Sequence, residues 1–136
     1  MLYVCDAPGG ATWFQIETEA EAARESDLMG HAVEKHFCLE RKRAASSYAP
    51  RPGLERDIGL EQHIRQVMPA FLTLRDHEGG GLATAMLLLP GRSAASGRSI
   101  IVGPRNSDPY PKHGKAIDAL AAHLGLKLDR ARCFPY

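Results

Sequence analysis

The chain has 136 residues, of which 44% are hydrophobic and 24% are charged, and its formal net charge is +1. A chain of this length and composition is expected to form one domain with its own apolar core, and its near-neutral charge argues against a nucleic-acid-binding protein with a broad basic surface. The longest apolar run, residues 82–89, is far shorter than the roughly 20 residues of a membrane-spanning helix. Asp6, Pro8 and Gly9 interrupt any signal-peptide-like start, so a cytoplasmic protein is expected.

Two strands are predicted at the start of the chain, over residues 2–5 and 12–17, around a turn at residues 7–10. Because side chains alternate between the faces of a strand, Tyr3 and Trp13 fall on the same face, opposite the other apolar residues of this hairpin. These two aromatic residues are therefore expected either to lie under another element or to form a contact surface.

The turn of this hairpin carries a short resemblance to a known family. The sequence Asp-Ala-Pro-Gly-Gly at residues 6–10 resembles the cofactor loop of RNA ribose methyltransferases that use S-adenosylmethionine, where the glycines let the backbone approach the cofactor. In that family a helix follows the glycines, whereas residues 12–16 of this chain predict a strand. The family's Lys-Asp-Lys-Glu catalytic residues have no evident place here, so the stretch is interpreted as a hairpin turn and no cofactor is predicted.

A long helix is predicted after the hairpin. Thr18 and Glu21 form a capping box, in which each side chain accepts a hydrogen bond from the backbone amide of the other residue. The helix is expected to continue to about Arg43, because apolar residues recur along it at helical spacing. Gly30 weakens the helix by roughly 1 kcal/mol relative to alanine.

A connector, a second helix and a second hairpin are predicted in the middle of the chain. Residues 44–53 are rich in serine and proline and predict a flexible connector. Asp57 is the expected N-cap of the next helix, which has one apolar face and ends at Pro69. Strands are then predicted over residues 70–75 and 82–89, and the continuous apolar run in the second indicates a central strand.

The last third of the chain predicts a loop, a strand and a helix. Residues 91–98 form a polar loop that is expected to be flexible, and residues 99–102 form a short β-branched strand. The final helix has Asp108 as its expected N-cap and Gly125 at its C-terminal end. Strands grouped in hairpins and helices in separate blocks indicate a single α+β domain, with three helices packed on a mostly antiparallel sheet of about five strands.

The connection between the last strand and the last helix has the densest group of side chains suited to binding. Arg105, Lys112 and His113 are suited to holding a small anionic or polar ligand near the start of the helix. His113 is also suited to carrying a proton, and Tyr110 to donating a hydrogen bond or stacking on the ligand. The alternative is that these residues only build the turn and the helix cap, and Pro109 weakens an anion site by removing one amide donor.

No other motif indicates a particular chemistry. His31 and His36 project about 140° apart around a helix, which suits a shared ligand poorly, so no metal site is predicted. Cys5, Cys38 and Cys133 form no close pair in the sequence. They are expected to be small packing or surface residues, and the alternative is that one of them is a reactive thiol.

These observations leave the biochemical activity open. Because no catalytic motif is present, the sequence predicts a small cytoplasmic protein that acts by binding a protein partner or itself. Tyr3 and Trp13 would suit the core of an interface in a homodimer. The alternative is a small-molecule-binding protein or small enzyme with its site in the connection at residues 105–113.

Overall fold

A computed structural model describes residues 1–49 and 59–135 of the chain. One antiparallel sheet contains five strands in chain order: β1 Leu2–Asp6, β2 Thr12–Gln15, β3 Ala70–Arg75, β4 Gly81–Leu87 and β5 Ile100–Val102. The α+β class and the antiparallel sheet of about five strands are thereby confirmed. The strand predicted to be central, β4, lies one position away from the centre, which β3 occupies.

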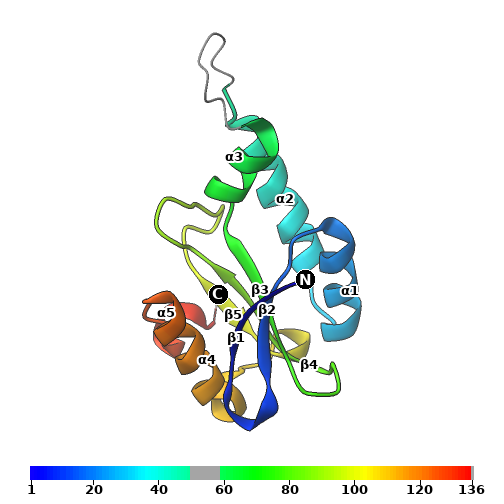
Figure 1. Ribbon diagram of the computed structural model, residues 1–136, viewed down its shortest axis with the longest axis vertical. Helices are drawn as coiled ribbons and strands as arrows, with labels where there is room; N and C mark the ends of the chain where they lie inside the picture. The colour runs from blue at the N-terminus through cyan, green and yellow to red at the C-terminus, as the bar shows by residue number, and fades with distance from the viewer. Residues whose placement is uncertain (50–58, 136) are drawn as a thin grey trace.

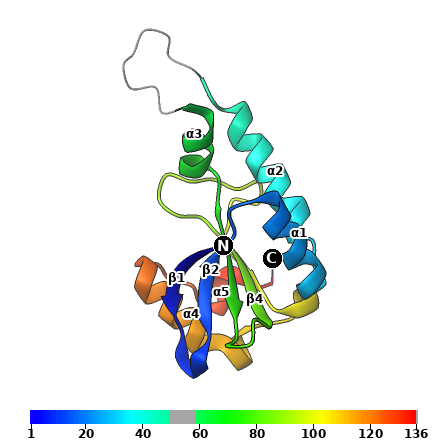
Figure 2. The same ribbon diagram turned by 45° about the vertical axis from the view of Figure 1, so that its right-hand side comes forward.

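Helices cover both faces of the sheet, with α1, α2 and α3 on one face and α4 and α5 on the other (Figures 1 and 2). Their bounds are α1 Glu19–Met29, α2 Val33–Ser46, α3 Gly59–Val67, α4 Tyr110–Leu124 and α5 Arg130–Cys133. Two short 3₁₀ helices lie in the connections, η1 Pro8–Gly10 and η2 Pro104–Asn106. None of the helices described has both the length and the apolar character needed to cross a membrane.

The central strand supplies side chains to two separate apolar cores. Leu72 and Leu74 of β3 are buried in the core that α4 covers, and Phe71 is buried in the core that α1, α2 and α3 cover. This alternation follows from the two-residue repeat of a strand. Both faces of β3 are therefore apolar, as expected of a strand between two helical layers.

Trp13 and Tyr3 have different surroundings. Trp13 is completely buried beneath α4, and its indole N–H donates to the carbonyl of Ala116 at 2.9 Å. Tyr3 remains 57% exposed on β1, which is an edge strand. Of the two roles expected for these residues, Trp13 has the first, because it lies under another element; the expectation that it forms an interface core is wrong.

The predicted long helix is divided into α1 and α2. The capping box of Thr18 and Glu21 is present as predicted. The first helix stops at Gly30 because this residue adopts a left-handed conformation with φ 65°, which glycine tolerates and which ends a helix. The described residues contain five helices instead of three, because of this break and because the one-turn α5 forms in the C-terminal segment.

The two predicted loops differ in the structure. Residues 44–46 form the last turn of α2 instead of a connector, and residues 50–53 and the predicted N-cap Asp57 lie outside the described residues. The loop at residues 91–98 packs against α2, since the amide of Ala95 donates to the buried carboxylate of Glu40 at 2.7 Å. Flexibility of this loop stays a prediction.

The ends of α4 are only partly as predicted. Gly125 ends the helix in a left-handed conformation with φ 67°, as expected. The N-cap is Pro109 instead of Asp108. Asp108 still supports this end of the helix, because its carboxylate accepts from the amide of Tyr110 at 3.1 Å and from Nε of Arg130 at 2.6 Å. The start of α4 is thereby tied to α5.

Candidate functional site

The structure separates two of the four residues predicted to bind a ligand. Arg105 lies in η2 and is exposed, and its Cγ is 3.3 Å from the position that a Cβ on Gly30 would occupy. Its stem therefore covers the turn between α1 and α2. Tyr110 instead donates its hydroxyl hydrogen to the carbonyl of Leu128 at 3.0 Å, on the side of α4 and α5. Arg105 and Tyr110 thus contact opposite helical layers.

Lys112 and His113 lie in the first turn of α4. Lys112 is exposed, whereas His113 is half-buried at a local irregularity of the helix, with φ −123°. Burial, and to a smaller extent the charge of Lys112, lowers the pKa of His113. None of the four predicted residues lines the pocket between α2 and β4. Ligand binding in the β5–α4 connection stays a prediction.

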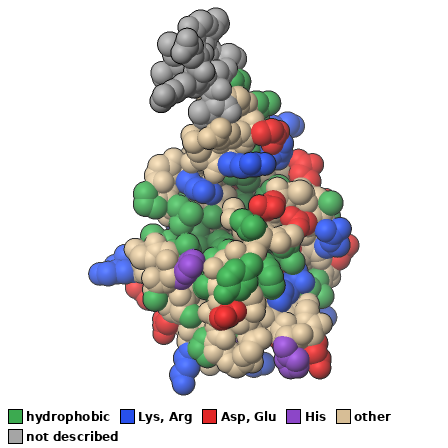
Figure 3. All heavy atoms as spheres, viewed as in Figure 1, with side chains coloured by type: hydrophobic (Ala, Val, Ile, Leu, Met, Phe, Trp, Pro, Cys, Tyr) green, Lys and Arg blue, Asp and Glu red, His purple; other side chains and the backbone are tan. Residues whose placement is uncertain are grey.

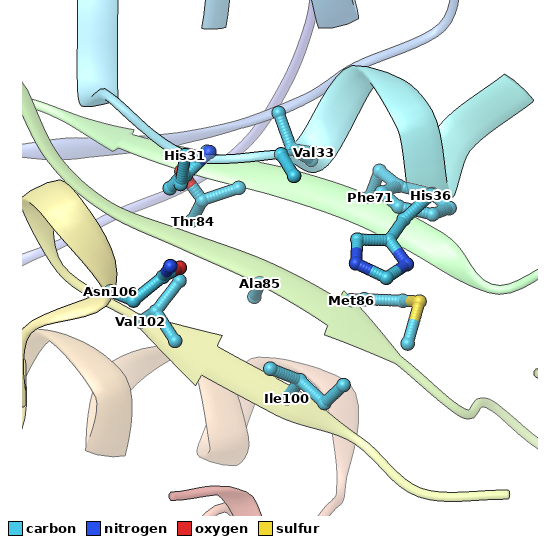
Figure 4. A pocket seen from close by; sticks show the side chains of 11 residues that line it. His31, Val33, His36, Phe71, Thr84, Ala85, Met86, Ile100, Val102 and Asn106 are labelled. Carbon is cyan, nitrogen blue, oxygen red and sulfur yellow. The ribbon is translucent and has the colours of Figure 1, made fainter. Parts of the chain in front are cut away.

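This pocket lies on the sheet face that carries α1 and α2, and its volume is about 50 Å³. Figure 4 shows it above Ala85 of β4, with His31 and Asn106 at one end and His36 and Met86 at the other. Other apolar side chains in the lining are Val33, Phe71, Ile100 and Val102. The pocket has room for several water molecules or for one end of a small ligand.

One wall of the pocket belongs to a polar network beneath α1. The hydroxyl of Thr84 donates to the carboxylate of Glu25, which is completely buried. Arg75 donates to the other oxygen of that carboxylate, and its Nε donates to the hydroxyl of Thr73 at 2.9 Å. The charge of Glu25 is therefore balanced by an ion pair and by hydrogen bonds, as a buried carboxylate requires.

His31 connects this network to the pocket. Because the hydroxyl hydrogen of Thr84 is directed to Glu25, the hydroxyl oxygen accepts from Nε2–H of His31 at 2.8 Å. Nδ1 of His31 is buried and has no hydrogen-bond partner among the described residues. Burial lowers the pKa of His31, because a second proton would sit on this enclosed nitrogen. His31 is thus held as a neutral imidazole in a fixed orientation.

The polar groups at the rim are able to recognise a ligand. His36 and Asn106 are both exposed where they border the pocket, and each side chain can donate and accept hydrogen bonds. Apolar walls with a few polar groups at the ends are typical of small-molecule sites. Within residues 1–49 and 59–135, no group of three or more His, Cys, Asp or Glu side chains is placed to hold a metal ion.

The three cysteines are free thiols. Cys5 and Cys133 are buried, and Cys38 is half-buried. Burial is the main cause that raises the pKa of each thiol, so all three are protonated at neutral pH. This favours their interpretation as packing residues over a reactive thiol.

The polar network was not predicted, although two signals for it are present in the sequence. Glu25 lies between Ala22 and Met29 on the buried face of α1, and Thr84 interrupts the apolar run at residues 82–89. A polar residue at an apolar position indicates a buried hydrogen-bonded group. The partner of each residue depends on the fold, because Glu25 and Thr84 lie far apart in the sequence.

Comparison with known proteins assigns no family to the chain. No protein-family model matches it, and no match was found among curated proteins or solved structures. A function is therefore inferred from the geometry of the pocket and of the polar network beside it.

Proposed function

We propose that this protein acts by binding, and that its ligand occupies the pocket between the α1–α2 turn and strands β4 and β5. The ligand has a compact apolar group, which lies against Met86, Ile100 and Val102, and a polar group that hydrogen bonds with His36 or Asn106. The observation that carries this proposal is the convergence of an apolar lining with polar groups at both ends of one pocket.

The burial and the hydrogen bonds of the Thr84 hydroxyl support binding over catalysis. A nucleophilic hydroxyl must be accessible and must pass its proton to a neighbouring base. The Thr84 side chain is buried, its hydrogen is directed to Glu25, and its oxygen accepts from His31. Nδ1 of His31, the nitrogen with a free lone pair, is itself enclosed. These groups are therefore suited to holding the pocket wall in place.

Small amides and alcohols with a branched alkyl group test this proposal, with isobutyramide and isobutyl alcohol as probes. A probe at 100 times its Kd should stabilise the protein by about 2.7 kcal/mol and raise the Tm by roughly 5 °C. Ile100→Glu should abolish the shift, because it places a charge in the apolar lining. Thermal unfolding measures the effect in each variant.

Arg105→Ala is the matched control, since Arg105 does not line the pocket and should leave the shift unchanged. A shift that survives Ile100→Glu and disappears in Arg105→Ala would move the site to the β5–α4 connection. If no probe stabilises the wild-type protein, the pocket does not bind this class of ligand.

Self-association is a second candidate function, which the exposed edge of the sheet favours. Met1, Leu2 and Tyr3 are 48%, 53% and 57% exposed, and Leu2 and Tyr3 belong to the edge strand β1. Two copies pairing through β1 would cover these side chains and extend the sheet across a homodimer. A cytoplasmic location is part of this proposal, because free thiols are typical of a reducing compartment.

Sedimentation velocity over a range of protein concentrations tests the homodimer. Tyr3→Lys should shift the protein towards monomer by placing a charge in the paired edge. Leu39→Lys is the matched control, because Leu39 has a comparable exposure of 48% but lies on α2. A wild-type protein that stays monomeric at high concentration, or equal effects of the two variants, would contradict pairing through β1.

A further inference from the structure

A second and larger hollow lies at the other end of the same helical layer. Its volume is about 910 Å³, and it is bounded by the ends of β1 and β2, the start of α1, and helices α2 and α3. Figure 3 shows this face hollowed near its centre, with apolar side chains at the base and charged side chains around the rim. We refer to it as the polar groove. Its volume is in the range of ligand sites in proteins.

The base of the polar groove is apolar and tightly packed. Ile16, Ile64 and Phe71 contribute to it, and each is exposed by no more than 2%. Phe37 also lies there, and its ring packs edge-on against Phe71 with ring centroids 5.1 Å apart. A base of this kind is rigid, but side chains buried to this extent present little surface to a ligand. Among the described residues, the exposed apolar side chain that borders the groove is Leu2.

One part of the rim is basic. Arg41, Arg65 and Arg92 border the groove, and Arg41 is bound to Glu61 at 2.7 Å. Arg92 is half-buried, and its guanidinium donates to the carbonyl of Met68 at 3.3 Å. Within the described residues, neither Arg92 nor Arg65 forms an ion pair.

The environment of Arg92 indicates an anionic partner. Burial lowers the pKa of Arg92, since its charge is partly removed from water without a carboxylate to balance it. Among the described residues, the Arg92 guanidinium donates only to the carbonyl of Met68. A carboxylate is the group that such a planar set of donors binds best, through two parallel hydrogen bonds.

The rim also has an acidic part, at the start of α1. Glu17 and Glu19 border the groove there, and neither forms an ion pair with another described residue. Two carboxylates next to the groove disfavour a ligand that is only anionic and favour one that also has an ammonium group. The charges of the rim therefore complement a ligand with one charge of each sign.

We propose that the polar groove binds a short peptide with free termini and apolar side chains. The peptide carboxylate pairs with Arg92 and Arg65, and the amino terminus lies near Glu17 and Glu19. Apolar side chains of the peptide lie against Leu2 at the edge of the groove, which buries apolar surface of both from water. This site shares only Phe71 with the pocket beside His31, so the two proposals are tested separately.

Trileucine with free termini, trileucine amide and N-acetyl-trileucine are the probes, and isothermal titration calorimetry measures their binding. Blocking either end should weaken binding at least 10-fold. Arg92→Gln should weaken the binding of trileucine to the level of trileucine amide and leave the binding of the amide unchanged. Glu19→Gln should weaken the binding of trileucine to the level of N-acetyl-trileucine and leave the binding of N-acetyl-trileucine unchanged. Arg98→Gln is the control, because Arg98 lies outside the groove and binds the carbonyl of Arg132.

The comparison of the three probes on the wild-type protein needs no variant, so it holds even if Arg92→Gln impairs folding. Equal binding of the three probes, or no binding at millimolar concentration, would overturn the proposal. Loss of binding on amidation without loss on acetylation would also overturn it, because the ligand would then be a simple carboxylate.

Discussion

Replacing Glu25 with alanine should lower the free energy of unfolding by about 3–5 kcal/mol, because it breaks a buried ion pair. Glu25 is completely buried and accepts from both Arg75 and Thr84. Without it, the Arg75 guanidinium would keep its charge in a mostly buried position and lose its counter-ion. Thr84 would also lose the acceptor of its hydroxyl hydrogen. Chemical denaturation monitored by circular dichroism measures the effect.

Two further variants separate the lost ion pair from a general loss of packing. Glu61→Ala removes a carboxylate from the exposed pair with Arg41 and should cost less than about 1 kcal/mol. The double variant Glu25→Leu with Arg75→Leu removes both charges and should recover much of the stability, because apolar replacement of a buried pair is often neutral. The buried ion pair does not stabilise the fold in this way if the double variant is as unstable as Glu25→Ala. The same conclusion follows if Glu25→Ala costs no more stability than Glu61→Ala.

Replacing Trp13 with alanine should also cost about 3–5 kcal/mol, because it removes a large and completely buried side chain. Trp13 fills the space between β2 and α4, and its N–H satisfies the carbonyl of Ala116. Trp13→Phe should cost less, about 1–3 kcal/mol, since it keeps an aromatic ring and loses only the indole hydrogen bond and part of the buried volume. Thermal and chemical unfolding of the two variants give both values.

Tyr3→Ala is the control for Trp13, because alternation along the strands predicts the two residues on the same face with the same role. Tyr3 is exposed, so its replacement should change the stability of the monomer by no more than about 0.5 kcal/mol. Equal losses for Trp13→Ala and Tyr3→Ala would contradict the burial of Trp13 beneath α4.

The strands were predicted well because their signals are local. Alternation and the turn residues at positions 7–10 and 76–81 place all five strands within a few residues of their observed bounds. The break in the first helix was missed, because a glycine inside an apolar stripe is compatible with a weakened helix as well as with a helix end. The left-handed φ of Gly30 decides between them, and it depends on tertiary packing.

The candidate site was harder to predict for a related reason. The site was predicted at residues 105–113 because side chains suited to binding are most frequent there. In the structure, Arg105 and Tyr110 contact different helical layers. Residues that do meet around the pocket, such as His31, Thr84 and Asn106, come from distant parts of the chain. Local patterns identify elements, but they contain no information on which of these elements converge.

The position of the three helices α1, α2 and α3 in the chain has a consequence for folding. All three lie between β2 and β3, which are neighbours in the sheet. The hairpins β1–β2 and β3–β4 join residues close in sequence, whereas the β2–β3 ladder forms only when residues 16–69 close into a loop. Closing a long loop costs conformational entropy before its contacts are gained, so the two halves of the sheet are early local units and their joining is the slow event.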